Sequence, residues 1–338
     1  MGDGMMTAIA FFTRKVGYDS GVVVSLRHLR RVLAEHGLES EYAEFTSDEE
    51  LVRLARTSVA DCLNIHVPSF SDETLAQVLQ TGKRVMLSIH STLCNLQTES
   101  GMLLRLFRLG RQYQDRLLIS CPSAREVVGM NALGAGRFVH LPNTFSYELP
   151  TEQAALAQAQ YRLKNSPGKV SFFSAYRPMK NLPVQVAAAC LCAREMPLEL
   201  HFSEGQEQNP LYQAVKEMAA MAGVPAVFHP GLNNPDFYRS LDDISVLLQV
   251  SLSETLSYVA LEHMARGIPV IGSASIPFAV LQADYSDVQD IAAKLRSILM
   301  PSDYPDYVKA ACRGARTVVQ ENNSLAYEVI QKFMKGEM

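Results

Sequence analysis

The stretch from Glu254 to Ile271 decides the fold and reads Glu-Thr-Leu-Ser-Tyr-Val-Ala-Leu-Glu-His-Met-Ala-Arg-Gly-Ile-Pro-Val-Ile. On an α-helix, Glu254 and Glu262 would lie within about 80° of each other, the first at the helix N-terminus and the second about two turns later. An apolar run precedes the stretch and a second one closes it, which predicts a strand–helix–strand unit. In an open α/β sheet this places Glu254 at the carboxyl edge of parallel strands, where such folds bind ligands.

Strands and helices are predicted to alternate through both halves of the chain. The expected strands are 6–12, 61–66, 84–90, 117–121, 137–141, 169–175, 197–203, 226–230, 244–250 and 268–273. The expected helices are 21–35, 71–80, 101–114, 123–132, 151–163, 180–194, 208–222, 234–240 and 256–266, followed by a helical tail over 286–336. Continuous apolar strands joined by helices predict parallel sheets covered on both faces. The fold class is therefore α/β, with two Rossmann-like domains facing each other across a cleft.

The length of 338 residues suits two domains, each large enough to bury its own core. We expect an N-terminal Rossmann-like domain over 1–150 and a linker over 151–168, which ends in Asn-Ser-Pro-Gly. A C-terminal Rossmann-like domain is expected over 169–320. A last helix over 321–338 is expected to cross back onto the first domain.

Composition narrows the class of protein. Hydrophobic residues make up 48% and charged residues 20%, as in an ordinary soluble enzyme. The net charge of −4 argues against tight generic binding to nucleic acids. The six cysteines form no paired Cys-x-x-Cys motifs, which favours reduced thiols over disulfides or a metal site. No stretch approaches the roughly 20 apolar residues of a membrane span, so a cytoplasmic protein is expected, at most peripheral to a membrane.

Further short motifs lie in a fixed order around the glutamate pair. They are Asp19-Ser20-Gly21 after the first strand, His66 and His90 at strand ends, Leu141-Pro142-Asn143, Arg177 and Lys180 after a strand, Phe228-His229-Pro230-Gly231, and the Gly-x-Pro-Val strand. In this order, from about residue 6 to 273, the chain resembles the GT-B glycosyltransferases. More narrowly, it resembles the large retaining group typified by family 4. The resemblance implies an acceptor-side first domain and a second domain that binds a nucleotide sugar.

The physical needs of a nucleotide sugar match these residues. Arg177 and Lys180 lie three positions apart at a strand-to-helix junction, so both can reach one leaving diphosphate. Backbone N–H groups near the expected helix N-terminus can reach the same oxygens. The resemblance implies that Glu254 binds hydroxyls of the donor sugar, Glu262 binds the ribose, and His90 contacts the sugar from the first domain. The implied catalytic residues are thus Arg177, Lys180, Glu254 and His90; the implied donor-binding residues are Glu262, Thr255, Leu256, Ser257, Tyr258, Gly21, Ser20 and His229; and the acceptor-side candidates are Asp19 and His66.

The resemblance also implies a mechanism. In this group the acceptor is thought to attack from the front face, with the departing phosphate taking its proton, so no carboxylate acts as a covalent nucleophile. No Asp-x-Asp sequence resembling a metal site is present, and we predict that neither a metal nor another cofactor is required. The acceptor is expected to be a hydroxyl group, and the sequence leaves open whether a glycan, a lipid-linked glycan, a protein, a metabolite or a modified nucleobase carries it.

Several alternatives stay open at this point. The segment Ser273–Val280 replaces the expected Gly-Gly-x-Pro-Glu and keeps only Ile276-Pro277. A catalytically inactive protein that binds a sugar nucleotide or a glycan is therefore the main rival, and a nucleotide-sugar epimerase is the second. Asp19 and Ser20 could simply cap the following helix, and His229 could approach the base through its backbone alone. His263 and Arg266 are expected on the surface.

A basic helix face is the last feature. Arg105, Arg108 and Arg111 recur every third residue and could meet an anionic acceptor or the surface of a membrane. Leucines lie between these arginines, so a helix that packs on the core and exposes a charged outer side is an equally natural interpretation.

Overall fold

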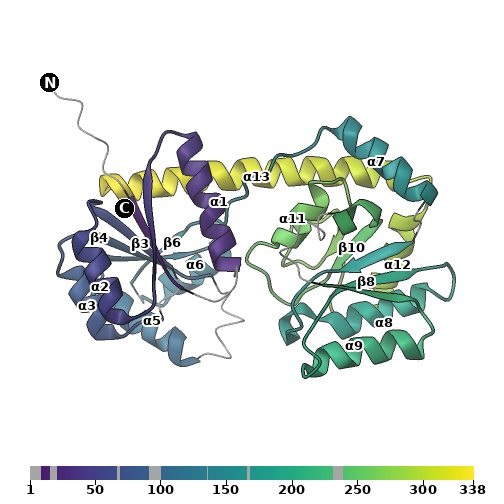
Figure 1. Cartoon of the computed structure of the whole chain (residues 1–338), viewed down its shortest axis with the longest axis horizontal. Coiled ribbons are helices and arrows are strands. Elements are labelled where there is room, and N and C mark those ends of the chain that lie inside the picture. Colours follow the sequence, from purple (N-terminus) through teal and green to yellow (C-terminus); the bar gives the residue numbers. More distant parts are fainter. Residues whose placement is uncertain are drawn as a thin grey trace. The chain divides into compact units, whose positions relative to one another are not determined.

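The computed structural model describes residues 9–15, 21–66, 69–90, 100–134, 136–165, 168–230 and 239–338 (Figure 1). The chain divides into two compact units, Met1–Ser146 with Val319–Met338, and Tyr147–Val318. Within these described residues, each unit contains one six-stranded sheet in which every strand pair is parallel. The predicted α/β fold with two Rossmann-like halves is confirmed, while the cleft between them stays a prediction.

The first unit has the strand order β2-β1-β3-β4-β5-β6. Its strands are β1 (Ile9–Arg14), β2 (Ser40–Phe45), β3 (Cys62–His66), β4 (Arg84–Ser88), β5 (Leu117–Cys121) and β6 (Arg137–His140), and its helices include α1 (Gly21–Glu35), α2 (Asp48–Thr57), α3 (Asp72–Leu79), α5 (Ser100–Gln112) and α6 (Ala124–Ala132). Apolar residues of α2, α3, α5 and α6 pack on one face of the sheet. Those of α1 and of the end of α13 (Tyr304–Lys335) pack on the other, so both faces are covered.

Sequence reasoning missed β2 and α2. β2 reads Ser-Glu-Tyr-Ala-Glu-Phe and lies at the edge of the sheet, where only Phe45 is buried, so it lacks the apolar run of the central strands. The signal for α2 was present in Ser47-x-x-Glu50. The Ser47 hydroxyl accepts the Glu50 N–H, and the Glu50 carboxylate accepts the Thr46 N–H at 2.8 Å. Such a reciprocal cap marks the start of a helix.

The second unit has the strand order β12-β11-β10-β7-β8-β9. Its strands are β7 (Lys169–Phe172), β8 (Glu199–Ser203), β9 (Ala226–His229), β10 (Val246–Gln249), β11 (Val270–Gly272) and β12 (Leu281–Gln282); its helices include α7 (Glu152–Asn165), α8 (Leu182–Cys192), α9 (Pro210–Met221), α11 (Tyr258–Met264), α12 (Val288–Leu299) and the start of α13, with 3₁₀ turns η2 (Pro178–Lys180) and η3 (Leu241–Asp243). One face packs on α8, α9 and α12. The other packs on η3 and α11.

Two expected boundaries differ from the structure. The stretch 151–168 is expected as a linker, but Glu152–Asn165 within it form α7, which belongs to the second unit because Ala155 and Ala159 are buried in that unit's core. The expected C-terminal segment 321–338 begins at Val319 instead and clusters with the first unit. There, Ala326 and Ile330 of α13 are fully buried.

Each sheet has one topological switch point, where the strand order reverses. It lies between β1 and β3 in the first unit and between β7 and β10 in the second. At such a reversal the loops that follow two neighbouring strands diverge and leave room for a ligand at the carboxyl edge. His66 ends β3, and the loops after β7 and β10 carry Arg177, Lys180 and Glu254. The topology therefore places the candidate residues of each unit at its switch point.

Candidate functional site

The loop after β7 turns sharply to bring Lys180 back toward β10. Arg177 precedes η2, and Asn181 follows it with φ of 55°, a left-handed conformation that asparagine tolerates better than most residues. The Asn181 side-chain amide donates to the Val250 carbonyl at 3.1 Å and to the Tyr285 carbonyl at 2.7 Å. These two bonds fix the turn that aims Lys180 at the loop after β10.

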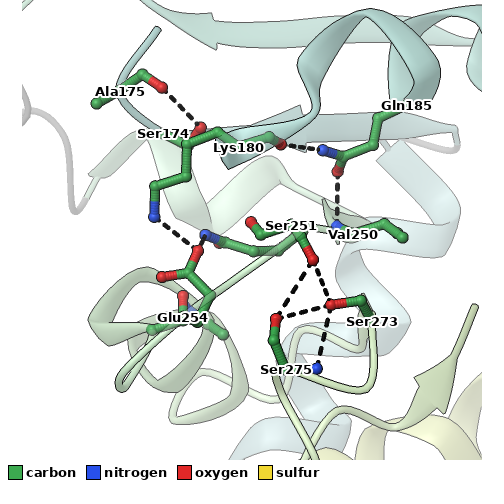
Figure 2. Close-up of polar contacts among 12 residues, drawn as sticks. Ser174, Ala175, Lys180, Gln185, Val250, Ser251, Glu254, Ser273 and Ser275 are labelled. Carbon is green, nitrogen blue, oxygen red and sulfur yellow. Dashed lines mark hydrogen bonds and ion pairs between the residues drawn. The ribbon is translucent and has the colours of Figure 1, made fainter. Parts of the chain in front are cut away.

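Lys180 and Glu254 form an ion pair at the switch point of the second sheet (Figure 2). The Lys180 Nζ lies 2.6 Å from Glu254 Oε1, and the Gln249 amide donates to the same oxygen at 3.0 Å. The Lys180 and Glu254 side chains are 18% and 7% exposed. Because both donors bind Oε1, Oε2 has no hydrogen-bond partner in the described part of the chain.

A second layer of hydrogen bonds holds this pair in place. The Gln185 side chain donates to the Lys180 carbonyl at 2.7 Å and accepts the Val250 N–H at 2.8 Å (Figure 2). The Leu252 N–H donates to the Met179 carbonyl at 2.9 Å. The loops after β7 and β10 are thus joined at several points, and the distance between their charged groups is fixed by the backbone.

Unpaired polar atoms lie next to the ion pair. Gln249 Oε1 and Ser251 Oγ are buried and have no hydrogen-bond partner among the described residues. Buried polar atoms are almost always paired, so these two indicate a ligand or solvent position. The Ser251 carbonyl accepts from Ser273 Oγ at 2.5 Å and from Ser275 Oγ at 3.3 Å (Figure 2). The altered segment Ser273–Val280 is therefore anchored beside the site.

Arg177 differs from Lys180 in its surroundings. Its side chain is exposed, and no carboxylate of the described residues pairs with it. Since Lys180 is paired with Glu254, Arg177 is the cation of this edge that remains available to an anionic ligand. The site therefore combines a positioned carboxylate, a paired lysine and an unpaired arginine.

The helix in the deciding stretch begins later than expected. α11 starts at Tyr258, because the Ser257 hydroxyl caps it by accepting the Ala260 N–H at 3.1 Å. Glu254 therefore lies in the preceding loop, and the prediction that Glu254 and Glu262 share one helical face is wrong. Thr255 and Leu256 are half-buried residues of the same loop. The sequence Ser257-x-x-Ala260 carries the cap signal that would have set this boundary.

Glu262 and His263 are both buried on α11. Glu262 is 9% exposed, and His263 is fully buried. His263 Nε2 lies 2.9 Å from Ser171 Oγ, and burial lowers the pKa of the ring to about 3. The prediction of a surface position for His263 is therefore wrong. α11 ends at Met264, and the chain turns at the following Gly267, whose φ is +66° and where a Cβ would lie 2.7 Å from the Ala155 side chain.

The first unit holds a separate polar pocket at the carboxyl edge of its sheet. His66 and His90 lie beside each other, with His66 Nδ1 2.8 Å from His90 Nε2 and the rings stacked at 5.0 Å. Burial lowers the pKa of His90 to about 4 and that of His66 well below its usual value, so both rings are neutral at neutral pH. His66 Nε2 is buried and unpaired within the described residues. The lining is Ser25, Leu29, His66, Ser88, Ile89, His90, Ser120, Leu141, Pro142, Asn143 and Thr144.

The pocket lining combines polar side chains with Leu29, Ile89, Leu141 and Pro142, and these described residues include no Asp, Glu, Lys or Arg. Ser88 Oγ donates to Asn64 Oδ1 at 2.7 Å, and Ser25 Oγ donates to Asn143 Oδ1 at 2.8 Å. An uncharged lining of hydroxyl, amide and imidazole groups is suited to hydroxyl groups of a ligand rather than to an ion.

The remaining predicted residues are distributed as follows. Asp19 and Ser20 lie outside the described residues, as does Gly231 of the Phe228–Gly231 motif. Gly21 is the first residue of α1, and apart from its chain neighbours and the adjacent helix backbone no atom of the described residues lies within 4 Å of where its Cβ would be. His229 ends β9 and is half-buried. Sequence reasoning missed Asn181, Gln185 and Gln249, although a glutamine that ends the apolar strand Val246–Gln249 was a visible signal.

The basic helix face is only partly free. Arg105 is ion-paired with Asp72 at 2.6 Å and also donates to the Phe70 carbonyl, and its side chain is 16% exposed. Arg108 and Arg111 of α5 are exposed. The prediction that all three arginines form one free cationic face is therefore wrong for Arg105.

Two further features are absent from the described residues. No helix there is both long and apolar enough to cross a membrane. No cluster of three or more histidine, cysteine, aspartate or glutamate side chains there is arranged to hold a metal ion.

Comparison with known proteins identifies the fold. No protein-family model matches the chain, and no curated protein matches it in sequence. Solved structures do match over nearly the whole length. HepE of Anabaena, determined in complex with UDP and glucose, has a TM-score of 0.71 at 12% identity, covering 97% of this chain and 99% of HepE.

Two further solved structures match the chain over nearly its whole length. Sucrose-phosphate synthase of Thermosynechococcus elongatus gives a TM-score of 0.67 at 14% identity, covering 97% of this chain and 98% of the synthase. The lipopolysaccharide outer core galactosyltransferase WaaB gives 0.63 at 13% identity, covering 98% of this chain and 100% of WaaB. The chain has the fold of the GT-B glycosyltransferases.

Proposed function

We propose that this protein is a glycosyltransferase that moves a sugar from a nucleotide-sugar donor to a hydroxyl acceptor. The observation that carries the proposal is the switch point of the second sheet, where the Lys180–Glu254 ion pair lies and where the same loop carries the exposed Arg177 three residues before Lys180. Cations there can neutralise the diphosphate as the glycosidic bond breaks, which is when its charge grows. HepE was determined with UDP bound, so a UDP-sugar is our first candidate donor.

In this proposal each residue has a distinct task. Arg177 binds the diphosphate directly, and Lys180 contributes charge while orienting Glu254. The free Oε2 of Glu254 accepts a hydrogen bond from a hydroxyl of the donor sugar. Transfer is proposed to retain the anomeric configuration and to require no metal, with the leaving phosphate accepting the proton of the acceptor hydroxyl.

We further propose that the pocket around His66 and His90 binds the acceptor. Its neutral, hydroxyl-rich lining supports a hydroxyl-bearing ligand. Of the other implied ligand contacts, those of His90 with the donor sugar and of Glu262 with the ribose stay predictions. A cytoplasmic location is likewise a prediction.

The test is release of the nucleotide from a panel of UDP-, GDP- and ADP-sugars, with and without simple glycoside acceptors. A transferase releases the nucleotide and yields a glycoside whose anomeric configuration matches the donor, with activity unchanged by EDTA. An inactive binding protein binds a donor without turnover. An epimerase changes the sugar while the nucleotide stays attached. Either of these two results would overturn the proposal.

A further inference from the structure

The side chains of Glu199, His201 and His229 form a hydrogen-bonded row across β8 and β9 of the second unit. His201 Nε2 lies 2.7 Å from Glu199 Oε1, and His201 Nδ1 lies 2.8 Å from His229 Nε2. His229 is paired in register with Ser203, so these residues all face the same side of the sheet. This row of side chains runs from the amino end of β8 to the carboxyl end of β9.

The order of donors and acceptors along this row of side chains follows from Glu199. A carboxylate only accepts hydrogen bonds, so the His201 Nε2–H donates to Glu199. Burial lowers the pKa of His201 to about 4 and also lowers the pKa of His229, so both rings are neutral at neutral pH. A neutral ring carries one N–H, so His201 Nδ1 accepts from the His229 Nε2–H. His229 Nδ1 is left as an acceptor, and no residue of the described chain donates to it.

A second unpaired group lies on the neighbouring strand, at Ser203, the position paired in register with His229. Ser203 is 4% exposed, and its hydroxyl has no hydrogen-bond partner within the described residues. A buried hydroxyl without a partner is uncommon and indicates a position filled by a ligand or solvent. The carboxyl ends of β8 and β9 therefore carry, at paired positions, an acceptor, His229 Nδ1, and a hydroxyl that can donate, Ser203 Oγ.

This pair lies along the same sheet edge as the proposed diphosphate site. The hydroxyl of Tyr176, the neighbour of Arg177, donates to the Ser203 carbonyl at 2.5 Å, so the two loops are in contact. β9 is two strands from β7, about 10 Å at the usual strand spacing. Glu254 follows β10, on the opposite side of β7. A nucleotide sugar with its phosphates at Arg177 and its sugar at Glu254 would therefore direct its base toward β8 and β9.

We propose that Glu199 and His201 fix His229 as the hydrogen-bond acceptor for an N–H of the donor's nucleobase, with the Ser203 hydroxyl donating to an adjacent carbonyl. This rests on the proposed nucleotide-sugar function. Uracil matches the pair, because its N3–H lies between two carbonyl oxygens. His229 and Ser203 are then specificity-determining residues, and Glu199 and His201 are positioning residues that act through His229.

The experiment compares the binding of UDP, 3-methyl-UDP and 5-methyl-UDP by calorimetry. Methylation at N3 removes the N–H, whereas methylation at carbon 5 adds the same bulk and keeps it. We expect the native protein to bind 3-methyl-UDP about tenfold or more weakly than UDP, and 5-methyl-UDP nearly as well as UDP.

Variants of Glu199 and His201 distinguish a positioning role of these residues from a purely structural one. His201→Phe and Glu199→Leu should lose most of the preference for UDP over 3-methyl-UDP, whereas Glu199→Gln, which can still accept from His201, should keep it. Asp243→Asn is the matched control, because Asp243 is the other partner of Lys169, 3.6 Å from Nζ, and does not touch His201. A purely structural role would weaken both ligands equally and leave their ratio unchanged.

Inorganic pyrophosphate distinguishes the possible failures. It should bind the native protein and His201→Phe alike, which also shows that the variant is folded, and should bind Arg177→Ala weakly. If UDP binds through Arg177 but the ratio to 3-methyl-UDP is near one, the inference is overturned and the proposed function survives. If neither UDP nor pyrophosphate binds the native protein, both are overturned.

Discussion

The two parallel sheets differ in strand order, but each has one switch point, and the carboxyl edges at these points carry different chemistry. At the edge of the first sheet, His66 and His90 are neutral and stand among serine and asparagine side chains. At the edge of the second, Lys180 and Glu254 form an ion pair beside the exposed Arg177. In both units the switch point creates the opening, so the residues that line it, and not the topology, decide which ligand can bind.

This contrast suggests a division of tasks. A diphosphate needs cations, which the second edge supplies, while a sugar hydroxyl needs neutral donors and acceptors, which the first supplies. Buried rings with lowered pKa values keep the first edge uncharged at neutral pH. Substitutions at either edge should therefore affect different ligands.

The largest effect is expected at the ion pair of the second edge. Lys180→Met removes a charge from the leaving group and should lower kcat by about 100- to 1,000-fold. It also leaves the 7% exposed Glu254 carboxylate with only Gln249 as a donor, which should cost about 3 kcal/mol of unfolding free energy. The double variant Lys180→Met with Glu254→Gln should regain stability but not activity, as urea unfolding and initial rates would show.

The exposed pair Lys216 and Glu207 of the same unit is the matched control. Lys216→Met should leave both stability and activity unchanged, because an exposed pair is well solvated. Full activity of Lys180→Met would contradict the assignment of the second edge to the leaving group.

A smaller effect is expected in the pocket of the first unit. His66→Phe removes the buried, unpaired Nε2 and the contact with His90, so the KM for the acceptor should rise about tenfold. The Kd for UDP should not change. His140→Phe, which alters a histidine at the end of β6 outside the pocket lining, should leave both values unaffected. An effect of His66→Phe on UDP binding alone would break the division of tasks.

Acid should destabilise the protein through its buried histidines. Burial lowers the pKa of His90 to about 4, while in the unfolded chain it is about 6.5. Between these values the unfolded state binds more protons than the folded state, so the free energy of unfolding falls as the pH falls. Each such histidine contributes at most about 1.4 kcal/mol per pH unit. His90→Asn should therefore make urea midpoints less dependent on pH between about 6.5 and 4, and an unchanged slope would contradict the neutral first edge.

The smallest effect concerns the surface of α5. If this helix meets anionic lipid, Arg108→Gln should weaken binding to phosphatidylserine vesicles about fivefold. Arg105→Gln should leave vesicle binding unchanged, because Arg105 is already paired with Asp72. Equal effects of both substitutions in a sedimentation assay would show that the pairing of Arg105 does not limit the cationic face.

The strand and helix periodicity predicted the α/β fold, because the central strands are continuous apolar runs and α1 covers the expected range of 21–35. What it missed depends on local side-chain bonds or contacts distant in sequence. The Ser257 cap moved the start of α11, and Ala155 and Ala159 turned an expected linker into part of a core. The candidate charges of the second site were visible as Arg177, Lys180 and Glu254. The bonds of Asn181 and Gln185 that position them cross about 65 to 104 residues of chain and follow no sequence period.

The central claim is that the edge of the second sheet binds the leaving nucleoside diphosphate through Arg177. Calorimetric titration of UDP into the native protein, Arg177→Ala and Arg194→Ala tests it most directly. Arg194 is an exposed arginine of the same unit that follows α8, away from the carboxyl edge. We predict that Arg177→Ala weakens UDP binding by about 10- to 100-fold while Arg194→Ala binds as the native protein does. Equal affinity of the native protein and Arg177→Ala would contradict the account.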